Sequence, residues 1–233
     1  MADITALQRM LGVSFNDLSL LEQALVHSSY VNENPGFTYG SNEKLEFLGD
    51  AVLGLIIAEK LYRDFPQFSE GEMTRLRAAL VRRETLARMA KTLGLGGYLS
   101  LGKGEEASGG RSKSSNLASV LEAVIATIFI DQDTAVTRDF ILRLFDRELE
   151  KVVSRGAVAD SKSRLQELIQ ARHQEMPAYH LIEAQGPAHN QTFTVEVRLA
   201  DTVLGRGSGR SKKIAETEAA RLALARLLSD FTA

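Results

Sequence analysis

The stretch NEKLEFLGDAVL, residues 42–53, carries three acidic side chains within a helical pattern of apolar residues. The acids are Glu43, Glu46 and Asp50, which follow one another at offsets of three and four. Residues at these offsets lie on one face of an α-helix, so the spacing predicts a helix with a stripe of three carboxylates. Like charges so placed destabilise a helix by roughly a few tenths of a kcal/mol per pair, unless a cation or a basic partner offsets them. A solvated acidic face is an equally good interpretation of these three acids taken alone.

A fourth acid, Glu122, lies in the apolar segment VLEAVIATIFI at residues 120–130, between Leu121 and Ala123. An unpaired charge in such a segment costs on the order of several kcal/mol, so Glu122 is expected to have a partner. Carboxylates on two packed helices, in a chain without cysteine, favour Mg²⁺ or Mn²⁺ over Zn²⁺. Such a site favours metal-assisted hydrolysis of a phosphodiester bond. Glu70 could add an outer ligand, although its place at a helix start favours a first-turn acid that stabilises the helix.

Beyond these acids, the chain resembles the ribonuclease III family. NEKLEFLGDAVL is similar to the family signature, and the resemblance extends through SEGEMTRLRAALV (69–81), GKGEE (102–106) and NLASVLEAVIATIFID (116–131). It covers the first domain and implies an endonuclease that cuts double-stranded RNA as a homodimer. The implied products have 5′-phosphate and 3′-hydroxyl ends with a short 3′ overhang, and the expected substrates are precursors of ribosomal and other RNAs. Phe47 is the implied aromatic residue of the dimer interface, and core packing is its alternative.

The resemblance also implies a role for each acid. Glu46, Asp50 and Glu122 are the implied ligands of Mg²⁺, which Mn²⁺ can replace, and Asp50 and Glu122 are the implied catalytic pair. Glu43 and Glu70 are implied to serve a second metal ion, its waters or the RNA.

Ser119 departs from the family pattern, which usually has Asp three residues before the glutamate that corresponds to Glu122. A neutral hydroxyl therefore replaces a carboxylate, and Ser119 is expected to hold a coordinated water at most. Losing even an outer-shell group typically lowers affinity or activity by about 10–100-fold. The alternative interpretation of the whole chain is a double-stranded RNA-binding protein that has lost efficient cleavage.

Residues 1–153 predict an all-α domain, because apolar residues recur at spacings of three and four. Asn42 is expected to cap the helix that begins at Glu43. Ser69 and Glu72 have the spacing of a capping box, which predicts a helix start before one long helix over Met73–Leu93.

Two polar segments separate the predicted helices. GKGEEASGGRSKSS at residues 102–115 is rich in glycine, serine and charge, and predicts an exposed loop of mixed order. SRGAVAD at 154–160 has no periodicity and is interpreted as a linker between domains. His27 is expected to cap or bridge helices, because a metal-bound water would remove the need for a side-chain base.

Residues 161–233 predict an α+β domain with the order αβββα, so the fold class is a two-domain protein with an all-α and an α+β part. Ser163 and Gln166 have capping-box spacing at the start of the first helix, and Ser211 opens the second. Alternating side chains predict three strands, at Tyr179–Glu183, Thr192–Arg198 and Thr202–Gly207.

The densest basic segment of the chain is GRGSGRSKK at residues 205–213. Taken alone it favours a solvated turn. Together with SRLQELIQ (163–170) and GPAHNQTF (186–193), however, it resembles the double-stranded RNA-binding domain in order and spacing. Such domains touch two successive minor grooves and the phosphates between them. By position, the implied RNA contacts are Gln166 and Glu167 in one groove, His189 in the other, and Arg210, Ser211, Lys212 and Lys213 towards the phosphates.

The composition of the 233 residues is that of an ordinary globular protein, with 44% apolar and 25% charged residues. A formal net charge of −2 argues against a uniformly basic nucleic-acid coat, and the lack of cysteine excludes disulfides and thiolate chemistry. No continuous apolar run reaches the length of a membrane span, and no secretory signal is visible at residues 1–25. A cytoplasmic protein without a membrane partner is therefore expected.

Overall fold

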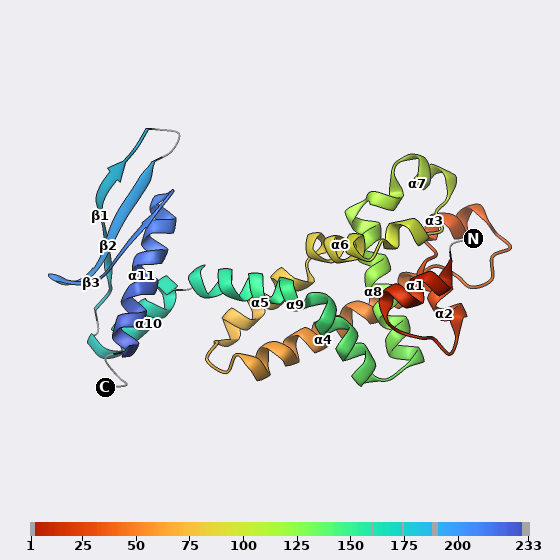
Figure 1. The fold of residues 1–233 in the computed structure, drawn as a ribbon, viewed down its shortest axis with the longest axis horizontal. Helices are drawn as coiled ribbons and strands as arrows, with labels where there is room; N and C mark the ends of the chain where they lie inside the picture. The colour runs from red at the N-terminus through yellow and green to blue at the C-terminus, as the bar shows by residue number, and fades with distance from the viewer. Residues whose placement is uncertain (1–2, 160, 174, 188–190, 230–233) are drawn as a thin grey trace. The chain divides into compact units, whose positions relative to one another are not determined.

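The structure, a computed structural model, describes residues 3–159, 161–173, 175–187 and 191–229 (Figure 1). The chain divides into two units, Met1–Val152 and Val153–Ala233. Residues 154–159, at the expected linker, continue the preceding helix.

The first unit is helical, as the sequence predicts. Its elements are α1 (Ile4–Leu11), α2 (Leu18–Ala24), α3 (Ser28–Glu33), α4 (Glu43–Asp64), α5 (Glu70–Val81), α6 (Arg83–Thr92), the 3₁₀ helix η1 (Leu95–Tyr98), α7 (Lys103–Ala107), the 3₁₀ helix η2 (Gly110–Ser112), α8 (Ser114–Asp131) and α9 (Thr134–Ala159). Helix α9 runs on to Ala159, within the expected linker.

Helix α8 is the central element of this unit, and eleven of its 18 residues are buried. It packs against α4 along its length and against α6 and α2. Within the described ranges, α8 is the one helix long and apolar enough to cross a membrane, yet 61% of it is buried inside the fold. A helix buried to this extent is a core helix, and its apolar residues pack against the helices that surround it.

Two predicted helix starts of the first unit are confirmed. The hydroxyl of Ser69 accepts a hydrogen bond from the backbone N–H of Glu72, and the Glu72 carboxylate accepts one from the backbone N–H of Ser69 at 2.7 Å. This is the predicted capping box. His27 caps α3 with its ring, where Nδ1 accepts from the N–H of Ser29 at 3.2 Å, so its structural role is also confirmed.

The prediction of one helix over Met73–Leu93 is wrong, because the chain forms two helices that separate at Arg82. The backbone of Arg82 is extended, with φ −67° and ψ 150°. The hydroxyl of Thr85 donates to the carbonyl of Ala79 at 3.0 Å and thereby satisfies an acceptor that a continuing helix would have used. No glycine or proline marks this break in the sequence, so local signals could not predict it.

The prediction of an exposed loop over 102–115 is right in exposure, since most of these residues are exposed, and wrong in secondary structure. The segment contains α7 and η2, and α8 already begins at Ser114. Its glycines allow close packing: a Cβ added to Gly110 would lie 2.7 Å from the carbonyl oxygen of Glu105. Polarity at this segment therefore reflects internal hydrogen bonds as well as exposure.

The second unit has the predicted order αβββα. It consists of α10 (Ser161–His173), β1 (Ala178–Gln185), β2 (Thr192–Leu199), β3 (Thr202–Gly209) and α11 (Lys212–Ser229). The sheet is antiparallel in the order β1-β2-β3. Helix α10 begins two residues before Ser163, the predicted opening residue. The buried core of this unit is formed by Leu165, Ile169, Val197, Ala219, Ala220 and Ala223.

Candidate metal centre and nucleic-acid interface

Asn42 fixes the start of α4, the helix that carries the acidic stripe. It is 2% exposed and lies at the N-cap position, as predicted, but its side chain makes no capping hydrogen bond. The side-chain amide instead donates to the carbonyl of Ala24 at 3.1 Å, and the backbone N–H donates to the carbonyl of Val26 at 2.8 Å. The prediction of a cap is therefore right in position and wrong in hydrogen bonding, and the start of α4 is tied to a distant segment.

Gly49 places the acids of α4 against α8. A Cβ at this position would overlap the carbonyl carbon and oxygen of Glu122 and lie 3.0 Å from its Cα, so the backbones of the two helices touch here. Gly49 is flanked in sequence by Glu46 and Asp50, and the crossing therefore brings both carboxylates to Glu122. Sequence reasoning did not single out Gly49, although a glycine inside a strong helical pattern indicates a packing reason of this kind.

The electrostatics of Glu122 show that these carboxylates lie close together. Burial, followed by the negative charges of Asp50 and Glu46, raises the pKa of Glu122 to about 8, and Arg83 opposes this rise. Glu46 and Asp50 on α4 therefore repel the charged form of Glu122 on α8 in the metal-free protein. Arg83, at the start of α6, is the nearby cation that sequence reasoning missed.

The other predicted site residues of this unit are Glu43 on α4, Glu70 on α5 and Ser119 on α8. Glu43 is exposed and accepts a hydrogen bond from the hydroxyl of Ser41 at 2.6 Å. Glu70 is exposed, accepts from the hydroxyl of Thr74 at 2.8 Å, and borders a pocket of about 300 Å³. Neither carboxylate is among the charges that act on Glu122. Ser119 is half-buried on α8, one turn before Glu122.

The donor set of the trio fits a hard divalent cation. Carboxylate oxygens are the ligands that Mg²⁺ and Mn²⁺ prefer, and a cation would relieve the repulsion that raises the Glu122 pKa. In the part of the chain that the structure describes, no group of three or more acids or histidines is already arranged as a metal site. The fit therefore rests on the type of the side chains and on their mutual charge.

The contribution of Glu122 to the stability of the metal-free protein should fall as pH rises, because Glu122 binds its proton more tightly in the folded than in the unfolded chain. Its pKa is 4.5 in the unfolded chain and about 8 in the folded one, so this loss falls between pH 4.5 and 8. The side chain of Glu122→Gln cannot ionise. We therefore expect the free energy of unfolding of this variant to exceed that of wild type by about 1–3 kcal/mol at pH 8.5, a range reduced for the partial exposure of the carboxylate.

Urea unfolding in EDTA at pH 5 and pH 8.5 measures this difference. The gain should be small at pH 5 and large at pH 8.5. If wild type is more stable than Glu122→Gln at pH 8.5, the Glu122 carboxylate is not buried and repelled as the structure indicates.

The second unit exposes most of the side chains predicted to contact RNA. Gln166 and Glu167 are exposed on α10. The hydroxyl of Ser211 accepts from the backbone N–H of Ile214 at 3.3 Å and caps α11. Arg210, Lys212 and Lys213 surround this helix start and are exposed, and none of them pairs with an acid among the described side chains. His189 lies outside the described residues.

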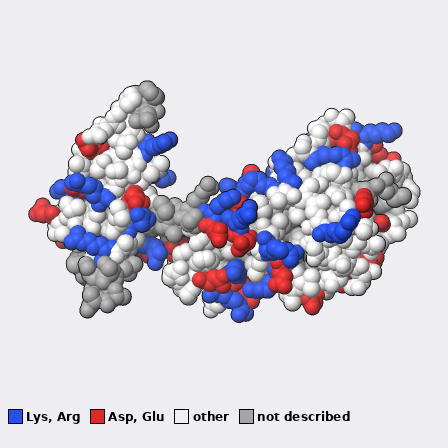
Figure 2. Space-filling view, in the orientation of Figure 1, with Lys and Arg blue, Asp and Glu red and all other residues white. Residues whose placement is uncertain are grey.

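Arg206 belongs to the basic segment in sequence, but in the structure it pairs with an acid. Its Nε donates to the carboxylate of Glu196 at 3.0 Å, and Glu196, only 4% exposed, also accepts from Arg198. Gly207, the next residue of β3, presses on α11, where a Cβ would overlap the backbone nitrogen of Ala219. Because neighbours in a strand point to opposite faces, Arg206 points away from α11. On the face that Figure 2 shows, basic and acidic side chains are interspersed, in keeping with the absence of a uniformly basic coat.

Two family models match the chain in the same order as its two units. Residues 17–149 match the family described as ribonuclease-III-like, and residues 161–227 match the double-stranded RNA binding motif.

Whole-chain relatives agree with this division. A Ribonuclease 3 of Dehalococcoides mccartyi strain 195 is 55% identical over 233 residues, which is 100% of this chain and 98% of the relative. A Ribonuclease 3 of a Roseiflexus species is 48% identical over 95% of this chain and 94% of its own length. The crystal structure of the nuclease domain of ribonuclease III from Campylobacter jejuni is 37% identical, with a TM-score of 0.58 over 64% of this chain and 97% of that domain.

Proposed function

The chain belongs to the ribonuclease III family and is an endoribonuclease with a double-stranded RNA-binding domain, and on that premise we propose its reaction. It hydrolyses phosphodiester bonds of double-stranded RNA with Mg²⁺ and leaves 5′-phosphate and 3′-hydroxyl ends. We further propose precursors of ribosomal and messenger RNA as substrates and the cytoplasm as the place of action.

The crossing of α4 and α8 at Gly49 is the observation that carries the proposed chemistry. Glu46, Asp50 and Glu122 would hold Mg²⁺, with Mn²⁺ as a substitute, and Asp50 and Glu122 would be the catalytic pair. When bound, the metal lowers the pKa of water and stabilises the charge that develops on the phosphate. Glu122 must release its proton to act as a ligand, so metal binding by this site should release protons near neutral pH. Glu43 and Glu70 are proposed to serve a second metal or the outer shell.

The exposed face of α4 supports the proposal of a homodimer. Phe47 is 81% exposed, and Leu55 and Tyr62 on the same helix are also largely exposed. Large apolar side chains gathered on one element mark an interaction surface. A second structure of the C. jejuni nuclease domain is described as flexible in a region involved in dimer formation of that protein. We propose that Phe47 belongs to the corresponding interface here.

The RNA-binding domain is proposed to hold the duplex near the metal centre. Gln166 and Glu167 would meet one minor groove and His189 the next, with Arg210, Ser211, Lys212 and Lys213 on the phosphates between them. The domains are proposed to span residues 1–153 and 161–233, joined by 154–160. Linking the two binding modules raises the effective concentration of the duplex at the metal centre without any new contact.

Cleavage of a perfectly paired RNA duplex tests this function. The duplex should be cut with Mg²⁺, left intact with EDTA, and yield 5′-phosphate and 3′-hydroxyl ends, while the separated strands resist cleavage. Tight binding of the duplex without any cut would favour the binding-protein alternative.

Ser119→Asp should restore a carboxylate one turn from Glu122 and tighten the metal site. We expect the Mg²⁺ concentration at half-maximal cleavage to fall by about tenfold, the lower end of the range for outer-shell groups. A Mg²⁺ titration of the cleavage rate measures it, with Ala135→Asp, at an exposed position of α9, as the control for added charge. An unchanged midpoint would show that position 119 does not serve the metal.

Replacing Lys212 and Lys213 together by alanine should weaken duplex binding and its salt dependence. Each lost phosphate contact lowers the slope of log K against log salt concentration by about 0.9, so we expect a change of about 2. Duplex affinity in EDTA across a series of salt concentrations measures the slope. Arg206→Ala is the control, because Glu196 already engages that guanidinium, and its slope should stay near that of wild type.

A further inference from the structure

Two buried asparagines lie at the starts of the two helices that carry the acids. Asn42 directly precedes α4, and Asn116 is the third residue of α8, where it is 6% exposed. Both side-chain amides donate to backbone carbonyls outside their own helix, at Ala24 and Gly110 respectively. Through these hydrogen bonds, each side chain ties the start of its helix to another part of the fold.

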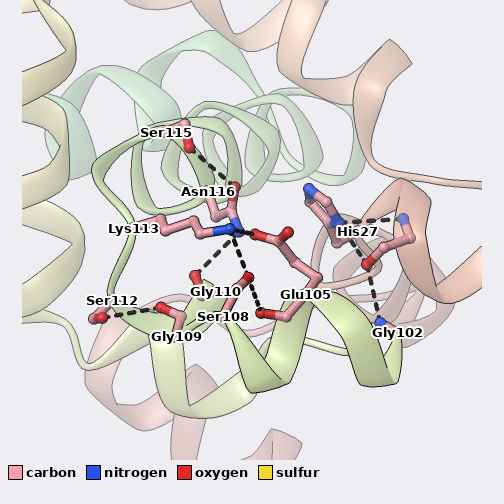
Figure 3. A network of polar contacts seen from close by, with 11 residues as sticks. His27, Gly102, Glu105, Ser108, Gly109, Gly110, Ser112, Lys113, Ser115 and Asn116 are labelled. Carbon is pink, nitrogen blue, oxygen red and sulfur yellow. Dashed lines mark hydrogen bonds and ion pairs between the residues drawn. The ribbon is translucent and has the colours of Figure 1, made fainter.

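Asn116 belongs to a network of polar contacts at the start of α8 (Figure 3). Its Nδ2 donates to the carboxylate of Glu105 at 2.8 Å and to the carbonyl of Gly110 at 3.0 Å. The ammonium of Lys113, at the N-cap position of α8, donates to the same Glu105 oxygen and to Ser108, both at 2.8 Å. The hydrogen bonds from Lys113 and Asn116 hold the pKa of Glu105 below its usual value. Glu105 is therefore an anion of α7 that binds the start of α8.

The segment that leads into α7 is in turn tied to α3 and to the residues just before it. The backbone N–H of Gly102 donates to the hydroxyl of Ser29 at 2.9 Å (Figure 3). Just before it, the N–H of Ser100 donates to the carbonyl of Leu25 at 2.8 Å, and the N–H of His27 donates to the carbonyl of Ser100 at 3.1 Å. These bonds join residues more than 70 positions apart in the sequence.

The series of hydrogen bonds reaches α4 at Asn42. The backbone N–H of Asn42 donates to the carbonyl of Val26, the residue between Leu25 and His27. A series of hydrogen bonds therefore runs from the start of α4 through residues 24–29 and 99–110 to the start of α8. Asn42 and Asn116 are its two ends.

We propose that Asn42 and Asn116 are positioning residues that fix α4 and α8 along their axes, so that Glu46 and Asp50 align with Glu122. Helices α4 and α8 pack along their length and their backbones touch at Gly49, but this packing alone does not prevent small sliding or rotation of one helix against the other. Asn42 precedes Gly49 by seven residues and Asn116 precedes Glu122 by six, so both anchors lie about 10 Å from the crossing. Anchors at that distance restrain both movements. The expected effect on catalysis rests on the proposed function, whereas the anchoring of the two helices does not.

Asn116→Ala should lower kcat of duplex cleavage by about 10–100-fold, because a misplacement near 1 Å is enough for such a loss. The Mg²⁺ midpoint should rise, while KM for the duplex stays within about twofold, since the RNA contacts lie on the other domain. Thr137→Ala is the matched control: Thr137 is fully buried in α9, donates to the carbonyl of Asp133, and lies outside the network. This control should lose stability but keep kcat, which separates positioning from general destabilisation.

A second measurement is independent of cleavage. The chain has no cysteine, so nitroxide labels can be attached at Lys44→Cys on α4 and Ile130→Cys at the far end of α8, both exposed positions. Pulsed electron paramagnetic resonance, with labelled chains diluted in unlabelled ones, gives the distance distribution within one protomer. It should shift or broaden with Asn116→Ala and stay unchanged with Thr137→Ala.

The two measurements separate the possible failures. An unchanged distance distribution, or an unchanged kcat and Mg²⁺ midpoint in a cleaving enzyme, would overturn the positioning role. A shifted distribution in a protein whose wild type cuts no duplex would overturn the proposed function and leave the anchoring by Asn116 in place.

Discussion

Replacing Gly49 by alanine should destabilise the nuclease domain by about 3 kcal/mol or more and lower duplex cleavage at least about 100-fold. The added methyl group would overlap the carbonyl group of Glu122, which is backbone and cannot rotate out of the way. The α4 and α8 axes would have to separate, and the core around α8 would lose its packing. The same movement would carry Glu46 and Asp50 away from Glu122. Urea unfolding measures the first effect, and cleavage below the unfolding transition measures the second.

Gly104 provides the control for this substitution. It lies in α7, and a Cβ added there meets nothing within 4 Å. Gly104→Ala should therefore change stability by less than about 1 kcal/mol and leave cleavage intact. A Gly49→Ala protein that unfolds and cleaves like wild type would show that the helices do not touch at this residue.

The sequence was sufficient where the determinants are local. Apolar spacing predicts the helical character of the first unit, and alternation in Thr192–Arg198 predicts β2 almost to the residue. The capping box at Ser69 predicts the start of α5, because its two hydrogen bonds lie within four residues. The burial of Glu122 likewise indicates that it needs a partner, since the cost of an isolated charge is general.

The remainder depends on contacts between distant residues. The order of residues 102–115 comes from hydrogen bonds to residues such as Ser29, more than 70 positions away, so composition alone gives the wrong answer. The break at Arg82 has no local breaker, and Arg206 leaves the basic segment because β2 places Glu196 beside it. The partners of Glu122 are fixed by a helix crossing at Gly49. Residue types in a pattern indicate the chemistry of the site, but packing selects which side chains meet.

Glu122→Gln should lower kcat by at least about 1,000-fold, because it removes a proposed metal ligand and not merely an outer group, whose loss typically costs about 10–100-fold. The amide is nearly isosteric, so the fold should survive, and the metal-free variant should be the more stable protein at high pH because it no longer carries a repelled carboxylate. Loss of activity together with a gain of stability is the pattern expected of a site whose charges serve the metal at the expense of the fold.

Single-turnover cleavage at saturating enzyme measures the rate of the variant, and duplex affinity in EDTA should stay within about threefold of wild type, since the RNA-binding domain is untouched. Glu150→Gln, which removes an exposed carboxylate of α9, controls for the change in net charge and should retain full activity. If Glu122→Gln cuts within about tenfold of wild type, Glu122 is not a metal ligand. In that case the raised pKa of Glu122 reflects only its burial beside Asp50 and Glu46, and the catalytic metal must be held by other acids, with the exposed Glu43 and Glu70 as the next candidates.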